Sequence, residues 1–122
     1  ERIRRQFTGH VKTIQGDYRK LFLDQKAAAK FLKEKLGGKK VDLIVFHHSL
    51  YYSGESEWSL ILENLFKTVL APKGAVHMVL MSSESEDPYS TTWLYNHFVG
   101  KFFGRKNDQD LLRFKKKLSG ND

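Results

Sequence analysis

Two short apolar runs on either side of one amphipathic stripe limit the fold of this chain more than any other feature. The runs at residues 41–46 and 75–81 are nearly continuous and too short to be helices of their own. Between them, large apolar residues recur at three- and four-residue steps from Trp58 to Val69, which predicts a helix. A strand, a helix and a strand in this order predict two parallel strands joined by a crossover, so the predicted fold class is α/β. The continuous apolarity of the first run also predicts a strand that is covered on both faces.

The remaining elements follow from helical spacing and from turn residues. One helix precedes the first strand and ends at Gly37 and Gly38, because glycine adopts the left-handed conformation of a helix end at little cost. Its apolar face comprises Ala28, Phe31, Leu32 and Leu36. We also expect an opening helix at 3–15, a strand at 18–23, a loop at 82–88, and helices at 89–102 and 111–118.

Length and composition bound the class of protein. The chain has 122 residues, which suits one domain and leaves no room for two. It contains no cysteine, so it has neither a disulfide framework nor a thiolate nucleophile, and we expect a cytoplasmic protein. No apolar run reaches the roughly 18 to 20 residues that span a bilayer, and we expect no membrane partner.

Positive charge is concentrated at the two ends of the chain. Residues 1–40 hold 12 Lys and Arg against 4 acidic residues, 41–99 hold 2 against 7, and 100–122 hold 7 against 3. Such basic ends could bind nucleic acid, with an affinity that falls steeply with salt. The lysines, however, fall mostly on the polar sides of predicted helices, and no aromatic side chains alternate with them to stack bases. We therefore expect no nucleic-acid partner.

Ligands of open α/β sheets bind outside the carboxyl ends of the strands, so the residues after each predicted strand are the candidates. They fall into three groups, at residues 24–25, 47–52 and 82–93. Adjacent residues on a strand point to opposite faces, which argues against a metal ion shared by His47 and His48. No Gly-x-Ser-x-Gly turn presents a serine nucleophile, and the acidic residues of 82–88 suit a solvated loop. No catalytic residue is assigned.

The aromatic residues near these strand ends are more informative. Tyr51 and Tyr52 follow the first strand, whereas Tyr89 and Trp93 stand four residues apart at a predicted helix start, hence on one face. Together they could form the walls of a pocket for a cationic or planar ligand. The spacing alone fits ordinary core and rim residues better than the walls of a pocket.

The order of these residues resembles a known family of enzymes. The stretch 41–52, the helix that ends in 69–74 and the strand 75–81 resemble the second half of a class I S-adenosylmethionine-dependent methyltransferase domain. Three features resemble the histamine N-methyltransferase-like family more particularly. They are the Leu-Tyr-Tyr sequence at 50–52, the Ser-Ser-Glu-Ser run at 82–85, and the pair Tyr89 and Trp93. The likeness spans nearly the whole chain.

This resemblance implies a Rossmann-like sheet of parallel strands flanked by helices and an N-methyltransferase that acts on a small amine, such as histamine or a related imidazole amine. It implies S-adenosylmethionine as cofactor and a monomer in the full-length form. By position in the family pattern, the cofactor-binding residues are Asp24, Gln25 and His47. The substrate-binding residues implied in the same way are His48, Tyr51, Tyr52, Tyr89 and Trp93.

The chain departs from the family pattern in several places. It has His48 where the histamine-type pattern has Gln, and Tyr89 where that pattern has Trp, which bears on the identity of the amine. No Gly-x-Gly-x-Gly loop occurs, and we expect that loop before residue 1 and the final strands after residue 122. Residues 1–122 are thus expected to be a single partial methyltransferase domain, truncated at both ends, that binds the cofactor poorly by itself. The alternative is a catalytically inactive α/β binding module derived from a methyltransferase.

Overall fold

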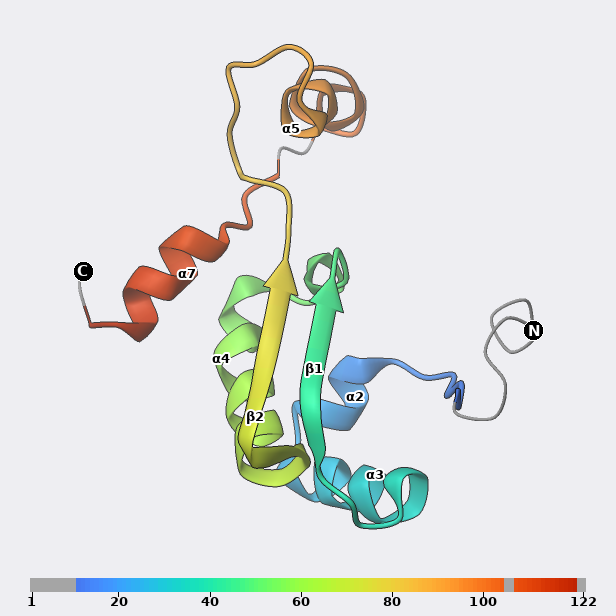
Figure 1. The fold of residues 1–122 in the computed structure, drawn as a ribbon. Helices are drawn as coiled ribbons and strands as arrows, with labels where there is room; N and C mark the ends of the chain where they lie inside the picture. Colours follow the sequence, from blue (N-terminus) through green and yellow to red (C-terminus); the bar gives the residue numbers. More distant parts are fainter. Residues whose placement is uncertain (1–10, 105–106, 121–122) are drawn as a thin grey trace.

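The computed structural model describes residues 11–104 and 107–120. Its centre is a sheet in which β1 (Val41–His47) pairs in parallel with β2 (Leu70–Val79). The two strands are joined through the short helical turn η1 (Leu50–Tyr52), the helix α4 (Glu55–Asn64) and the wider helical turn η2 (Leu65–Val69), as Figure 1 shows. The predicted α/β class and strand–helix–strand unit are confirmed, although β2 begins at Leu70 and ends at Val79 rather than spanning 75–81.

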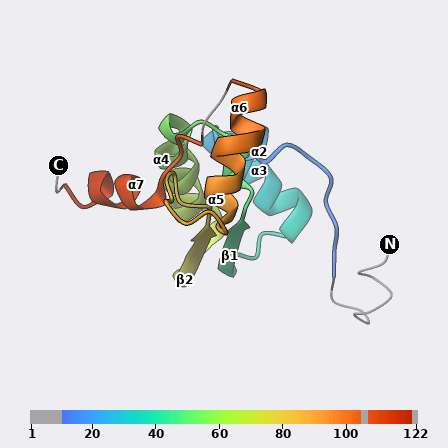
Figure 2. The ribbon, with the colours of Figure 1, turned by 90° about the horizontal axis from the view of Figure 1, so that it is seen from above.

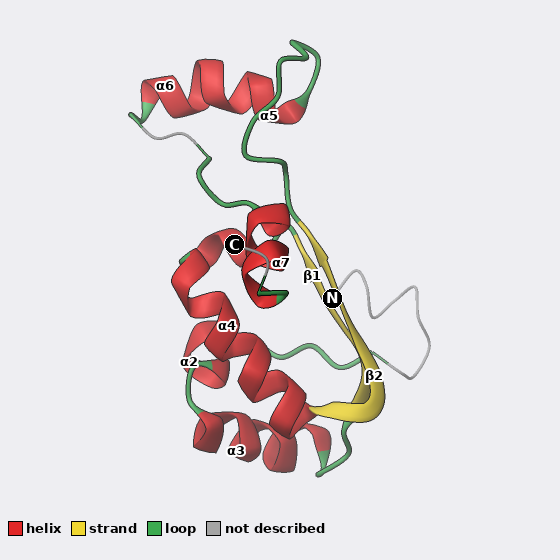
Figure 3. Ribbon diagram, turned by 90° about the vertical axis from the view of Figure 1, so that its left-hand side faces the viewer, coloured by secondary structure: helices red, strands yellow, loops and turns green. Residues whose placement is uncertain are grey.

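The hydrophobic core lies on one face of this sheet, between the strands and the helices. Trp58, Ile61 and Leu65 project from α4 and η2 into the core, and Phe46 meets them from β1. The strand β1 was expected to be covered on both faces, and the structure corrects this for the described part of the chain. Leu43 is 59% exposed and Val45 is also exposed, because the helices of Figure 3 all lie on the opposite side of the sheet.

The predicted strand at 18–23 is wrong, because Tyr18–Phe22 forms the short helix α2. The Asp17 carboxylate accepts a hydrogen bond from the Arg19 backbone N–H and thereby caps the helix. The Tyr18 hydroxyl lies 3.0 Å from the Ser49 carbonyl and 2.9 Å from the Ser53 hydroxyl, so α2 is tied to the turn after β1. A run this short does not separate strand from helix by spacing alone.

The helix that precedes β1 is confirmed as α3 (Gln25–Leu36). Asp24 caps its first turn through a 2.7 Å hydrogen bond from the Ala27 N–H, and Gly37 ends it with a φ of 64°. The predicted opening helix at 3–15 falls largely on residues 1–10, which lie outside the described residues. Its last part is corrected, since residues 11–16 form no helix.

Beyond β2, a loop at 80–90 leads into a helical segment made of α5 (Thr91–Leu94), η3 (Tyr95–Val99) and α6 (Gly100–Phe102). We call this segment the outer helix, and Figure 2 shows it in front of the strand ends when they are viewed from above. The last helix, α7 (Leu111–Leu118), is confirmed and packs beside α4. No helix of the described residues is both long and apolar enough to cross a membrane.

Candidate functional site

A cleft of about 460 Å³ lies outside the carboxyl ends of β1 and β2, where open α/β sheets bind ligands. Its walls come from four parts of the chain, namely η1, the residue Met81 after β2, the outer helix and the segment 107–109. The lining residues are Tyr51, Tyr52, Met81, Tyr95, Asn107, Asp108 and Gln109. The cleft therefore combines three tyrosine side chains with one exposed carboxylate and two side-chain amides.

The chain leaves β1 through His48, whose φ of 51° makes it the only residue other than glycine with a positive φ in the described residues. Such a conformation is uncommon for a residue with a side chain. It turns the His48 ring so that it lies edge-on to His47, with ring centroids 4.8 Å apart, and stacks near-parallel over Tyr51 at 6.3 Å. The prediction that His47 and His48 point to opposite faces is therefore wrong. Among the described residues, no group of three or more metal-ligating side chains gathers there.

The two tyrosines after β1 differ in how firmly they are held. The Tyr51 hydroxyl accepts a hydrogen bond from the Met81 backbone N–H, so this side chain joins η1 to the end of β2. Tyr52 is 71% exposed and makes the open lip of the cleft. The sequence placed both residues at the site, and both line the cleft.

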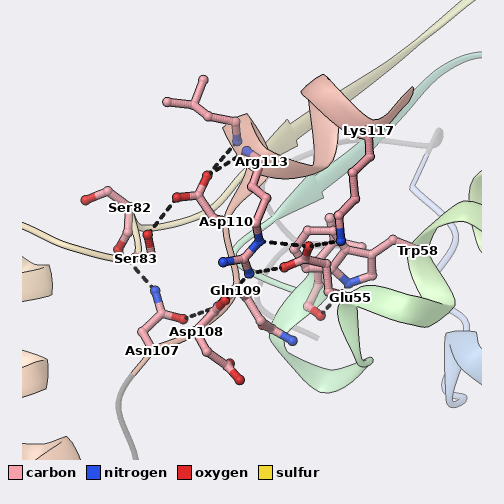
Figure 4. A network of polar contacts seen from close by, with 12 residues as sticks. Glu55, Trp58, Ser82, Ser83, Asn107, Asp108, Gln109, Asp110, Arg113 and Lys117 are labelled. Carbon is pink, nitrogen blue, oxygen red and sulfur yellow. Dashed lines mark hydrogen bonds and ion pairs between the residues drawn. The ribbon is translucent and has the colours of Figure 1, made fainter. Parts of the chain in front are cut away.

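The opposite wall is the segment 107–110, which is fastened to both strand ends by side-chain hydrogen bonds. Figure 4 shows Asn107 beside Ser82 and Ser83, at the end of β2. Asn107 donates from Nδ2 to the Ser82 carbonyl at 3.1 Å, and Gln109 donates from Nε2 to the Ser53 carbonyl at 2.7 Å. Because Ser53 follows β1 and Ser82 follows β2, these contacts hold the wall across the carboxyl end of the sheet.

Asp110 continues this wall into α7. Its carboxylate accepts from the Ser83 hydroxyl at 2.6 Å and from the backbone N–H groups of Leu112 and Arg113 at 2.7 and 3.1 Å, which caps the helix. The hydrogen bond from Ser83 and those from the helix start lower the pKa of Asp110 below its ordinary value of 3.8.

A second carboxylate connects α7 to α4 below the cleft. Glu55 accepts from the Arg113 guanidinium through both oxygens and lies 3.6 Å from the Lys117 Nζ, as Figure 4 shows. The hydrogen bond from Arg113 lowers the pKa of Glu55 from its ordinary value of 4.5. Asp110 and Glu55 thus favour their charged forms and fix the start of α7 beside the site.

The structure does not bring together all residues that the family resemblance implied. Asp24 and Gln25 begin α3, which packs against η2 at the end of the sheet where the strands start (Figure 1). His47 lies at the other end of β1. The Asp24 carboxylate is already engaged as the cap of α3. The predicted cofactor residues are therefore split between the two ends of the sheet.

Tyr89 and Trp93 also lie apart from the cleft lining. The expectation that both sit on one helix face is wrong, because the helix begins at Thr91 with Ser90 as its cap, and Tyr89 precedes it. Tyr89 is 92% exposed. The Trp93 ring stacks on His97 at 4.0 Å, on the outer helix.

Sequence reasoning missed Tyr95 and the wall formed by 107–110. A usable signal was Asp110 directly before the apolar stripe of α7, because an Asp before a helical stripe predicts a cap and hence a helix start. It would not have predicted that the preceding residues cross the strand ends.

Comparisons with protein-family models, with curated proteins and with solved structures find no significant match to this chain.

Proposed function

We propose that this chain is part of an S-adenosylmethionine-dependent N-methyltransferase that acts on a small amine such as histamine or a related imidazole amine. The observation that supports the proposal best is the cleft itself. It places three tyrosines and the Asp108 carboxylate outside the ends of two parallel strands that a helix joins. In this proposal the two strands belong to a partial Rossmann-like sheet.

The chemistry of the cleft suits a planar, positively charged amine. Tyrosine faces attract cations and planar rings by about 0.5 to 2 kcal/mol for each well-placed contact. A carboxylate at the same cleft favours the ammonium form of one nitrogen. The nitrogen that accepts a methyl group needs a free lone pair, so the reacting nitrogen must be a different one or must first lose its proton. An imidazole amine offers both: an amine nitrogen that carries the charge, and a nitrogen of the neutral imidazole ring that has a free lone pair.

The residues of this chain do not form a site for S-adenosylmethionine by themselves. When bound, that cofactor supplies a methyl group on a sulfonium sulfur. The sequence has no glycine-rich loop to approach the amino-acid end of the cofactor, and Asp24 and Gln25 stand at the far end of the sheet from His47. We therefore propose that this chain holds and orients the amine. The residues that do so are Tyr51, Tyr52 and His48, whose positive φ turns its ring over Tyr51. Positioning of this kind contributes much of the rate in a group transfer.

The experiment measures transfer of a labelled methyl group from S-adenosylmethionine to histamine and to a panel of small amines, with the full-length gene product that contains this chain. We expect a methylated imidazole amine. Asp108→Asn is expected to raise KM for a cationic amine, whereas Asp42→Asn, an exposed carboxylate at the start of β1, leaves it unchanged. Tyr51→Leu is expected to lower kcat/KM, with circular dichroism to check the fold.

Two results would contradict the proposal in different ways. Binding of S-adenosylmethionine without transfer to any amine would exclude the amine as substrate while keeping the cofactor. Absence of both binding and transfer in the full-length product would favour the inactive binding module. That alternative is favoured by one observation, namely the poor fit of this chain's residues to the cofactor.

A further inference from the structure

The outer helix turns its polar side toward the body of the protein and its apolar side outward, which is the reverse of the usual arrangement. Its polar side chains face the body of the protein, where the buried Thr92 donates from Oγ1 to the Ser82 carbonyl at 3.0 Å. Asn96 donates from Nδ2 to the Ser83 carbonyl and accepts from the Asn107 N–H, each at 3.1 Å. A surface helix of a globular protein normally turns its apolar side inward. Here polar contacts hold the helix, and its apolar side is left outside.

The outward side of the helix is mostly apolar and aromatic, and we call it the aromatic face. Phe102 is 85% exposed, and its ring packs edge-on against the exposed Phe103 with centroids 5.2 Å apart. One shallow apolar hollow runs along this side. The aromatic face comprises the exposed residues Leu94, Phe98, Val99, Phe102 and Phe103. Contiguous apolar exposure of this kind marks a binding surface.

The segment that carries the aromatic face is basic in sequence, and the acidic Glu84 borders a second hollow on the polar side of the outer helix, with Asn96. No acidic residue occurs between Asp87 and Asp108, whereas Lys101, Arg105 and Lys106 do. Lys101 borders the same hollow as the phenylalanines. The partner that complements this surface is therefore apolar at its centre and anionic at its rim.

An anionic lipid bilayer has that chemistry, and we propose that the aromatic face binds the surface of such a bilayer. Helices that lie in the membrane interface bury phenylalanine and leucine among the acyl chains, while nearby lysines meet the headgroups. Nucleic acid would use the cations and would leave the aliphatic Leu94 and Val99 in water. The expectation of no membrane partner rested on the lack of a spanning run, which a helix lying in the interface does not need. This inference is independent of the proposed methyl transfer.

The test is co-sedimentation of the chain with vesicles of phosphatidylcholine alone or with about one third phosphatidylserine. We expect binding to the mixed vesicles, little binding to the neutral ones, and weakening of binding as salt increases. The double variant F102S/F103S is expected to weaken binding at least about tenfold, because two phenylalanines no longer enter the interface. Lys101→Gln should weaken it less.

The matched control is L60S/F66S, which changes two other exposed apolar residues, on α4 and η2. We expect this control to bind vesicles like the unchanged chain, and circular dichroism checks that both double variants fold. The proposal is overturned if the chain does not sediment with anionic vesicles, or if the two double variants lose binding equally. Self-association that F102S/F103S abolishes, with no vesicle binding, would identify a second copy as the occupant instead.

Discussion

Phe114 is expected to be the residue that holds α7, and with it the far wall of the cleft, on the body of the protein. Its side chain is buried and packs edge-on against the fully buried Trp58 of α4, with ring centroids 5.3 Å apart. Leu111 of α7 also packs against the core, and Arg113 and Lys117 form ion pairs with Glu55 of α4. Pairs whose cations are half-exposed, as these are, contribute little.

Replacing Phe114 by alanine should lower the free energy of unfolding by about 3 kcal/mol. Truncation of a buried phenylalanine costs roughly 3 to 5 kcal/mol, because the apolar contacts are lost and a cavity remains. We expect the lower end of that range, because α7 lies at the surface and can move toward α4 to fill part of the space. The edge-on contact with Trp58 accounts for about 0.5 to 1.5 kcal/mol of the loss.

The measurement is urea unfolding followed by tryptophan fluorescence. Trp58 and Trp93 are the two tryptophans of the chain, so Trp93→Phe isolates the signal of Trp58. Phe114→Ala should shift the folded-state emission of Trp58 to longer wavelength, since water reaches the ring. Leu112→Ala, on the same helix but 73% exposed, is the control and should change stability by less than about 0.5 kcal/mol. An unchanged Trp58 spectrum together with equal effects of the two variants would refute this role of Phe114.

Three further predictions concern pH, strand packing and helix capping. Hydrogen bonds lower the pKa values of Asp110 and Glu55, so their charged forms stabilise the folded chain. In thermal unfolding, this contribution should be fully present above about pH 5 and should be lost as the pH falls through the ordinary values of 3.8 and 4.5 and below. Gly74→Ala should destabilise the chain in urea, because its Cβ would lie 3.0 Å from the Asp42 carbonyl, whereas Gly16→Ala should not, since its nearest neighbour is 3.8 Å away. Asp24→Ala should cost about 1 kcal/mol in urea unfolding and Asp24→Asn much less, because asparagine also caps a helix; equal losses would contradict the capping role.

Local pattern was sufficient where an element's own residues decide its structure. The apolar run of β1, the stripe from Trp58 to Val69 and the closure of α3 at Gly37 are all visible in the sequence, because strand burial, helical spacing and glycine's left-handed conformation are local properties. The same logic located Tyr51 and Tyr52 at the carboxyl end of a parallel strand, where both line the cleft.

Spacing failed where a long-range contact decides the conformation. The residues of α2 are too few to display a period, and the bonds of Tyr18 to the turn after β1 hold them in place. His48 was assigned the alternation of a strand, yet its φ of 51° turns its ring toward its neighbours. The start of the outer helix at Thr91 moved Tyr89 off the face that it was expected to share with Trp93.

In the cleft, one wall follows from local sequence and the other depends on tertiary contacts. Residues 51–52 and 107–109 are separated by more than fifty positions, and no periodicity relates them. They meet because Gln109 bonds to the Ser53 carbonyl, Asn107 bonds to the Ser82 carbonyl, and Phe114 docks α7 on Trp58. Local sequence thus specified the strand, the helix and the tyrosines that follow the strand. The opposite wall, and with it the volume and charge of the cleft, depended on hydrogen bonds and packing that exist only when the distant segments are folded together.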